Sequence, residues 1–273
     1  KSYSLKVKDI LDINMDYKKI YEILKKIKSE YVYRRLNDLG VNNIDDEFLD
    51  ILKSDNLISN FINDVKVFLS NIKVTSFKEV SDKFDTLVFE GAQGLMLHES
   101  YKYFPHVTPS KTGLENVVDL LDELYKDYTK EEKSKTGIEA IYITRCYLTR
   151  HGAGPLSREL KEKPYEKIVD MTNIPNRFQG ILRFALLDLD LLKENIEDDF
   201  NKISTNNYDI KKSIAVTCLD QVDNNVKYYF NDKLKSSKQE EFINDVINKI
   251  TPYKCYISKG PTRETIMQRN NKL

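Results

Sequence analysis

Two polar side chains, Gln93 and Thr108, stand fifteen positions apart in a segment whose composition suits a ligand-binding loop. A short apolar run at residues 87–89 precedes them and predicts a buried strand. Beside Gln93, the glycines Gly91 and Gly94 let the backbone turn sharply and approach a ligand closely. Open α/β sheets usually place their ligands at a strand that ends in such a loop. A tight strand-to-helix connection without a ligand fits the same pattern.

Two further segments place arginines in polar loops. Arg150 and His151 follow a run of strand-forming residues and precede two glycines and a proline, so they stand at the mouth of a shaped loop. Arg177 and Arg183 lead into a strongly apolar run. A guanidinium group can bind a carboxylate or phosphate with two parallel hydrogen bonds, and a polar loop that enters a buried helix suits anion recognition. The alternative is an ordinary turn with a solvated arginine and a structural histidine.

Two polar groups follow predicted strands in the C-terminal part of the chain. Asp220 comes directly after the apolar run at residues 213–219, and Ser258, Gly260 and Pro261 end or follow the run at residues 253–258.

The elements that must position these residues alternate between strands and helices after residue 84. The predicted strands are residues 84–90, 139–147, 213–219 and 253–258, and the predicted helices are residues 16–38, 58–72, 113–128, 180–196 and 239–250. This alternation predicts an α/β fold with a mostly parallel central sheet flanked by helices. We expect two parts, a helical subdomain at residues 1–80 and an α/β nucleotide-binding core at residues 81–273.

The composition excludes several classes of protein. Lys plus Arg and Asp plus Glu both number 43, so the net charge of zero gives no electrostatic reason to expect nucleic acid or a membrane as the main partner. The three cysteines have no CxxC spacing, which argues against a zinc site or a disulfide framework and favours a reducing cytosol. No apolar run is long enough to span a bilayer, so we expect a soluble, cytoplasmic protein.

The polar segments together resemble one known family. The chain reads FEGAQG and FPHVTPSKTG around Gln93 and Thr108, TRHGAGPL around Arg150, VTCLD at Asp220 and SKGPTR after the last strand. In this order and spacing they are similar to the motifs of adenylosuccinate synthetases. The resemblance implies a P-loop-type α/β fold. FPHVT, TRHGAGPL and FQGILRFALLDLDLL are most similar to the phage branch of the family, which joins aspartate to deoxyguanylate on the way to 2-aminoadenine DNA; a phage-encoded protein would work in the host cytoplasm.

The resemblance implies a ligase of purine nucleotide biosynthesis. Such an enzyme joins L-aspartate to the 6-position of IMP or dGMP, with GTP or ATP as co-substrate, Mg²⁺ as cofactor and a homodimer as the assembly. The implied roles are catalysis and purine monophosphate binding for Gln93, monophosphate binding for Thr108, aspartate binding for Arg183, Arg177 and His151, and triphosphate-base binding for Asp220, Ser258, Gly260 and Pro261. The family has a lysine where this chain has Cys218, so GTP and ATP both remain open, as do IMP and dGMP.

The family's phosphate loop, catalytic aspartate and catalytic histidine have no counterpart in this sequence, and no metal ligand is expected in this chain. The resemblance starts about a third of the way into a full-length member, so we expect this segment alone to bind parts of the substrates without catalysing the reaction. The alternative is a non-catalytic nucleotide-binding relative, or a subunit completed by another chain.

Overall fold

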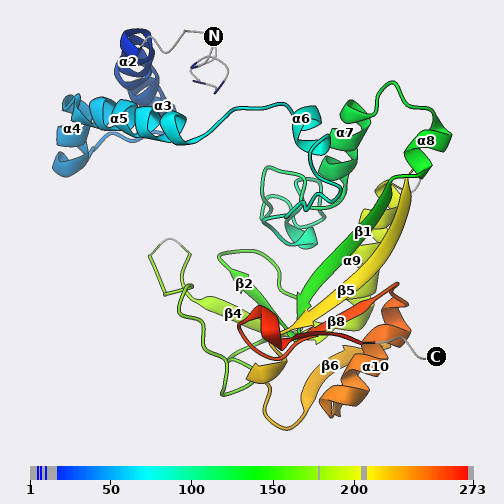
Figure 1. The fold of residues 1–273 in the computed structure, drawn as a ribbon. Coiled ribbons are helices and arrows are strands. Elements are labelled where there is room, and N and C mark those ends of the chain that lie inside the picture. Colours follow the sequence, from blue (N-terminus) through cyan, green and yellow to red (C-terminus); the bar gives the residue numbers. More distant parts are fainter. Residues whose placement is uncertain are drawn as a thin grey trace. The chain divides into compact units, whose positions relative to one another are not determined.

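The structure is a computed structural model that describes residues 17–177, 179–203 and 208–269, together with residues 5, 7 and 10. The chain forms two compact units, Lys1–Lys83 and Phe84–Leu273 (Figure 1).

The first unit is helical in its described part. Its helices are α2 (Tyr17–Lys26), η1 (Ile27–Val32), α3 (Tyr33–Asp38), α4 (Asp46–Lys53), α5 (Asn56–Asn71) and α6 (Phe77–Ser81). Ile20 of α2 packs on Ile58 and Ile62 of α5 in a small apolar core. Asp55, just before α5, accepts a 2.9 Å hydrogen bond from Tyr21 and pairs with Lys28. The helices predicted at residues 16–38 and 58–72 are confirmed from Tyr17 onward, residue 16 lying outside the described part.

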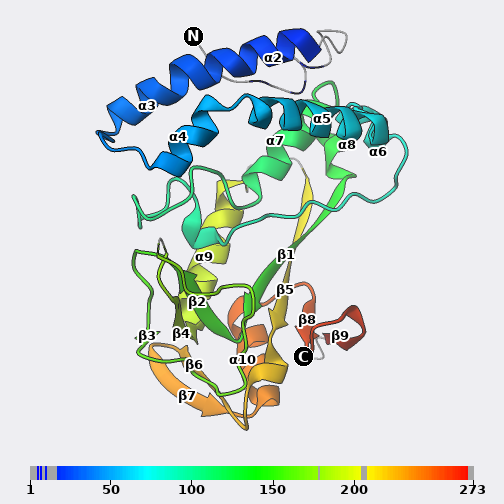
Figure 2. The same ribbon diagram turned by 90° about the vertical axis from the view of Figure 1, so that its left-hand side faces the viewer.

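The second unit contains two sheets. The first has the order β1-β5-β8-β9, and its strands are β1 (Gly137–Arg145), β5 (Asp209–Thr217), β8 (Cys255–Ser258) and β9 (Ile266–Arg269). Strands β1, β5 and β8 are parallel, and β9 pairs with β8 in the antiparallel direction. The carboxyl ends of the three parallel strands therefore meet at one edge of the sheet (Figures 1 and 2).

The second sheet is mixed. Its strands are β2 (Tyr147–His151), β3 (Glu159–Leu160), β4 (Leu182–Asp188), β6 (Val226–Phe230) and β7 (Lys233–Ser237). Strand β4 lies at its centre, antiparallel to β2 and β3 and parallel to β6. The register of β2 and β4 places Arg150 directly opposite Arg183.

The second unit also contains helices. They are α7 (Glu115–Leu124), α8 (Lys130–Ser134), α9 (Leu189–Lys202) and α10 (Gln239–Ile250), with the short 3₁₀ turns η2 (Leu95–Leu97), η3 (Leu219–Gln221) and η4 (Arg263–Thr265). The main core joins Ile196 of α9 and Phe242 of α10 to Ile214 and Val216 of β5. The predicted α/β fold with a mostly parallel central sheet flanked by helices is confirmed.

Two of the predicted elements are wrong. Residues 84–90 form no strand: they are irregular, and Val88 is 90% exposed. A strand needs a neighbour to pair its backbone groups, and no described strand lies alongside this run. The helix predicted at residues 180–196 is instead strand β4 followed by α9, because a short apolar run suits a buried strand as well as a helix and here it pairs with β2 and β6. Asp188 marks the boundary, since its side chain accepts the first amide hydrogens of α9 from Asp190 and Leu191.

Candidate functional site

The segment that carries Gln93 and Thr108 closes on itself. The Thr108 amide donates to the carbonyl of Leu97 over 2.8 Å, and the Glu99 amide donates to the carbonyl of Ser110 over 3.0 Å. These bonds tie the middle of the segment to the short turn η2, which begins two residues after Gln93. The result is a compact loop at residues 91–113 with its two ends close together, a geometry common in functional loops. The Gln93 side chain is exposed and makes no hydrogen bond within the described residues.

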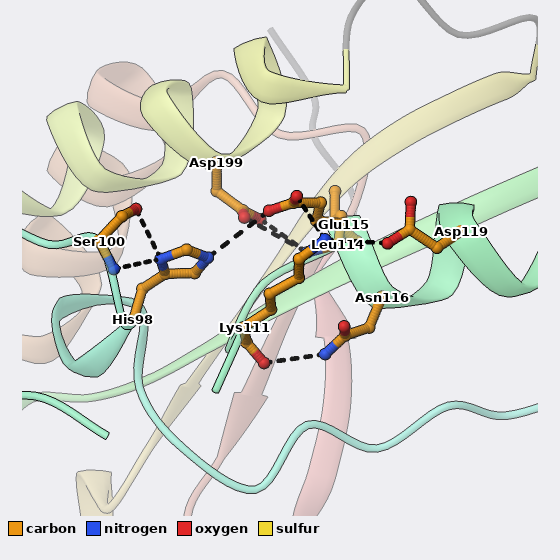
Figure 3. Close-up of polar contacts among 8 residues, drawn as sticks. All are labelled: His98, Ser100, Lys111, Leu114, Glu115, Asn116, Asp119 and Asp199. Carbon is orange, nitrogen blue, oxygen red and sulfur yellow. Dashed lines mark hydrogen bonds and ion pairs between the residues drawn. The ribbon is translucent and has the colours of Figure 1, made fainter. Parts of the chain in front are cut away.

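A buried carboxylate on α9 fixes the end of this loop (Figure 3). Asp199 is only 4% exposed. Its oxygens accept the Leu114 amide at 3.3 Å, which satisfies a donor at the start of α7, and the Tyr142 hydroxyl at 3.0 Å. Gly113 packs so closely that an added Cβ would lie 2.5 Å from Cγ of Asp199. Burial raises the pKa of the Asp199 carboxyl, while the hydrogen bonds from Tyr142 and Leu114 act in the opposite direction.

His98 belongs to the same structural cluster. Its Nδ1 accepts the Ser100 amide at 3.1 Å, which places the ring proton on Nε2, 3.6 Å from Oε2 of Glu115. Lys111 pairs with Glu115 at 2.6 Å and with Asp119 at 3.0 Å, and this lysine lowers the pKa of Glu115 (Figure 3). These contacts join the loop to the first turns of α7, so His98 has a structural place here.

The loop after β2 is held by arginines. Arg183 pairs with Glu159 through Nε and Nη2, at 2.7 and 2.5 Å, and its Nη1 donates to the carbonyls of Gly152 and Gly154 at 3.0 and 2.8 Å. Arg183 therefore fixes this loop in the structure. His151 ends β2 opposite Leu182, and its buried Nε2 has no hydrogen-bond partner within the described residues.

Arg177 lies in a tight turn that precedes β4. The turn is closed by two backbone hydrogen bonds between Asn176 and Gly180, at 3.0 and 2.8 Å. This turn is not part of the loop that Arg183 holds, so Arg177 and Arg183 have different surroundings.

Asp220, Ser258, Gly260 and Pro261 gather at the carboxyl ends of β5 and β8. The parallel register pairs Val216 with Ile257, so the residues that follow each strand emerge side by side. Asp220 lies in the turn η3 and is exposed, and its carboxylate makes no hydrogen bond or ion pair within the described residues.

The loop after β8 is narrow. Ser258 donates to the carbonyl of Gly260 over 3.0 Å, and the Lys259 amide donates to Thr265 over 3.2 Å. An added Cβ on Gly260 would lie 2.8 Å from Cγ2 of Thr265. Strand β2 connects this region to the loop at residues 152–158, which contains Gly152 and Gly154 and is called the glycine loop below. At the start of β2 the Tyr147 hydroxyl donates a hydrogen bond to the side chain of Gln221. Arg150 and His151 stand at the other end of the strand.

Neither a metal cage nor a membrane segment is found in the described part. No cluster of three or more His, Cys, Asp or Glu side chains that could hold a metal occurs there. No described helix combines the length and the apolar character needed to span a bilayer.

Comparison with known proteins identifies the family. The family model of adenylosuccinate synthetase matches residues 1–259. The chain is 29% identical to the adenylosuccinate synthetase of Clostridium botulinum strain Eklund 17B over 161 residues, which cover 58% of this chain and 33% of that protein. It is 28% identical to that of Methanococcus maripaludis strain S2 over 195 residues, covering 70% of this chain and 51% of that protein.

A third relative, the adenylosuccinate synthetase of Thermoplasma volcanium, is 30% identical over 127 residues, covering 45% of this chain and 27% of that protein. The chain thus spans between about a quarter and a half of the length of these relatives. Since the family model matches nearly the whole sequence, the chain belongs to the adenylosuccinate synthetase family.

Proposed function

We propose that the chain forms the substrate-binding part of a ligase that joins L-aspartate to the 6-position of a purine nucleotide, with a nucleoside triphosphate as co-substrate. The observation that carries this proposal is the family match over residues 1–259. The geometry supports it, because the residues with an expected role stand on loops and strand ends, where Gln93 and Asp220 are exposed.

The acceptor nucleotide is assigned to the loop at residues 91–113. In the proposed reaction the 6-oxygen of the purine gains negative charge as it is phosphorylated, and an aimed donor stabilises that charge. The Gln93 amide is exposed and unbonded within the described residues, so it is available for this task. The Thr108 hydroxyl would hold the 5′-phosphate, and its backbone position is fixed by the bond to Leu97.

The aspartate is assigned to the glycine loop and the segment before β4, through Arg183, Arg177 and His151. The unpartnered Nε2 of His151 supports this assignment, because a buried polar atom is normally satisfied and a ligand oxygen would do so. Arg183 is already bonded to Glu159, so its contribution would be to shape the loop unless the ligand displaces that carboxylate.

The triphosphate base is assigned to Asp220, with Ser258, Gly260 and Pro261 as the walls of its pocket. A carboxylate is an acceptor only, and the edge of guanine presents adjacent N–H donors. We therefore propose GTP over ATP, although Cys218 stands at the position where the family has a lysine. Phosphoryl transfer also requires Mg²⁺, and we assign no described residue to that ion.

We further propose dGMP as the acceptor and a cytoplasmic homodimer as the assembly. The support for dGMP is the likeness of FPHVT, TRHGAGPL and FQGILRFALLDLDLL to the phage branch. IMP is the competing acceptor.

The test measures both binding and turnover. The 273-residue chain, and any longer product of the same reading frame, is supplied with aspartate, Mg²⁺ and either GTP or ATP, with dGMP or IMP as acceptor. Succinylated product from dGMP with GTP is the expected result for the longer product, and nucleotide binding without turnover is the expected result for the 273-residue chain alone. Product from IMP alone would replace the acceptor proposal. Absence of product from either acceptor, with nucleotide binding that Gln93→Ala abolishes, would instead indicate a non-catalytic nucleotide-binding protein.

A further inference from the structure

We propose that Arg150 is a positioning residue that fastens the loop carrying Thr108 to the glycine loop after β2. This inference rests on the proposed function for its consequence in nucleotide binding, but its structural part can be tested without any ligand.

The geometry of Arg150 joins two segments that are far apart in the sequence. Its Nη2 donates to the carbonyl of His106 at 2.8 Å, two residues before Thr108. Its Nε donates to the carbonyl of Ala153 at 3.0 Å, within the glycine loop. One planar guanidinium thus holds a carbonyl from each loop, which a single ammonium on a flexible stem would not reproduce with the same geometry.

Gly154 shows how closely the two loops approach. Its φ is +108°, a conformation that favours glycine, and an added Cβ would lie 2.5 Å from Cβ of His106. The two loops are therefore in direct contact at this point, and the Arg150 bonds lie across that contact.

The charge of Arg150 is balanced differently from that of its cross-strand neighbour. Arg183, directly opposite, is neutralised by Glu159. Arg150 has no ion pair with a described carboxylate, and burial together with the charge of Arg183 lowers its pKa. Its hydrogen bonds go to carbonyl dipoles instead, so the side chain acts on the backbone of the His106–Thr108 segment.

The ligand-free test is hydrogen–deuterium exchange of the 273-residue chain. In Arg150→Met, which keeps an unbranched apolar side chain but removes the guanidinium, amides of residues 99–110 should exchange about tenfold faster or more, the scale of one charge-assisted hydrogen bond. Arg150→Lys should fall between the wild type and Arg150→Met. Amides of β1 and β5 should be unchanged. The matched control is Arg269→Met, a partly buried arginine of the same unit that bonds Asn244 and Glu240 on α10.

Two results would overturn the proposal. Unchanged exchange of residues 99–110 in both Arg150 variants would show that the loop does not depend on this side chain. Equal acceleration across β1 and β5 would show a general loss of stability instead of a local positioning role.

The second measurement tests whether Arg150 affects nucleotide binding through Thr108. Thr108→Val, Arg150→Met and the double variant are compared for affinity toward dGMP or IMP and toward the matching nucleoside without phosphate. If Arg150 acts through Thr108, the double variant should lose about the same affinity for the monophosphate as either single variant, and nucleoside binding should not change. If the affinity losses of the two single variants multiply in the double variant, Arg150 contacts the ligand itself and positioning through Thr108 is refuted. If the wild type binds neither compound, the proposed function fails, while the exchange result still decides the role of Arg150 in the loop.

Discussion

The two ends of the candidate site are positioned by different kinds of contact. Asp220 and Ser258 stand where β5 and β8 end, and the parallel register of those strands brings them together. Gln93 and Thr108 stand on a loop that side chains from elsewhere hold, Asp199 of α9 at its end and Arg150 of β2 at His106. The backbone hydrogen bonds of the sheet fix the positions of residues at strand ends. The loop instead depends on a few long-range polar contacts that single substitutions can remove.

The largest expected effect is that of Gly113→Ala. The new methyl group would overlap the buried Asp199 carboxylate, which Tyr142 and Leu114 hold in place. We expect the free energy of unfolding of the second unit to fall by about 3 kcal/mol, measured by urea denaturation followed by circular dichroism.

The matched control for this variant is Gly137→Ala at the start of β1. An added Cβ at this glycine meets nothing within 4 Å. Equal losses in the two variants would contradict the view that the loop depends on its contact with Asp199.

A smaller effect, on binding alone, is expected at the strand ends. Asp220→Asn should weaken GTP binding about ten- to hundredfold, because a charged acceptor is removed. Its thermal stability should match the wild type, since the carboxylate has no bonding partner within the described residues. Calorimetric titration checks this, with Asp223→Asn, three residues later, as the control that keeps affinity. A loss of stability in Asp220→Asn would mean that this end also depends on side-chain contacts.

The pH dependence of stability should reveal the buried carboxylate that anchors the loop. The pKa of Asp199 in the folded protein is raised above its ordinary value of 3.8 by burial. The folded state therefore binds a proton more strongly than the unfolded state, so the contribution is favourable below pH 3.8 and declines as the pH rises through the folded pKa.

Asp199→Asn removes this titration and leaves the neighbouring groups His98 and Lys202 in place. The stability of the wild type relative to this variant should therefore fall from acidic toward neutral pH in urea denaturation series. A difference that stays flat or rises with pH would contradict a raised pKa.

The smallest effect is expected where the predicted strand at residues 84–90 does not form. Val88→Ser should change the free energy of unfolding by no more than about 0.5 kcal/mol, because this side chain is exposed. Val216→Ala, a buried core residue near the carboxyl end of β5, should cost about 2 kcal/mol in the same measurement. A large loss in Val88→Ser would mean that the segment is packed.

Much of the fold could be predicted from local patterns. The helix at residues 239–250 has the bounds expected of it, and strands were expected where β1, β5 and β8 lie. The run at residues 182–188 could not be assigned by pattern, because its apolar residues suit a helix or a buried strand and only pairing with β2 and β6 decides between them. The run at residues 87–89 shows the converse: a strand-like composition forms no strand without a partner.

The same distinction, between what local pattern predicts and what tertiary contacts decide, applies to the candidate site. The residue types on the polar loops, the order of the motifs and the α/β fold class could all be predicted from the sequence, because they depend on local composition and spacing. Only the tertiary structure showed that Asp199 caps α7 and packs on Gly113, since its hydrogen-bond partner lies 85 positions earlier in the chain. It also showed that Arg183 is bonded to Glu159 while Arg150 joins two loops, because the β2–β4 register and the folding of distant segments, not the identity of the residue, decide what each guanidinium can reach.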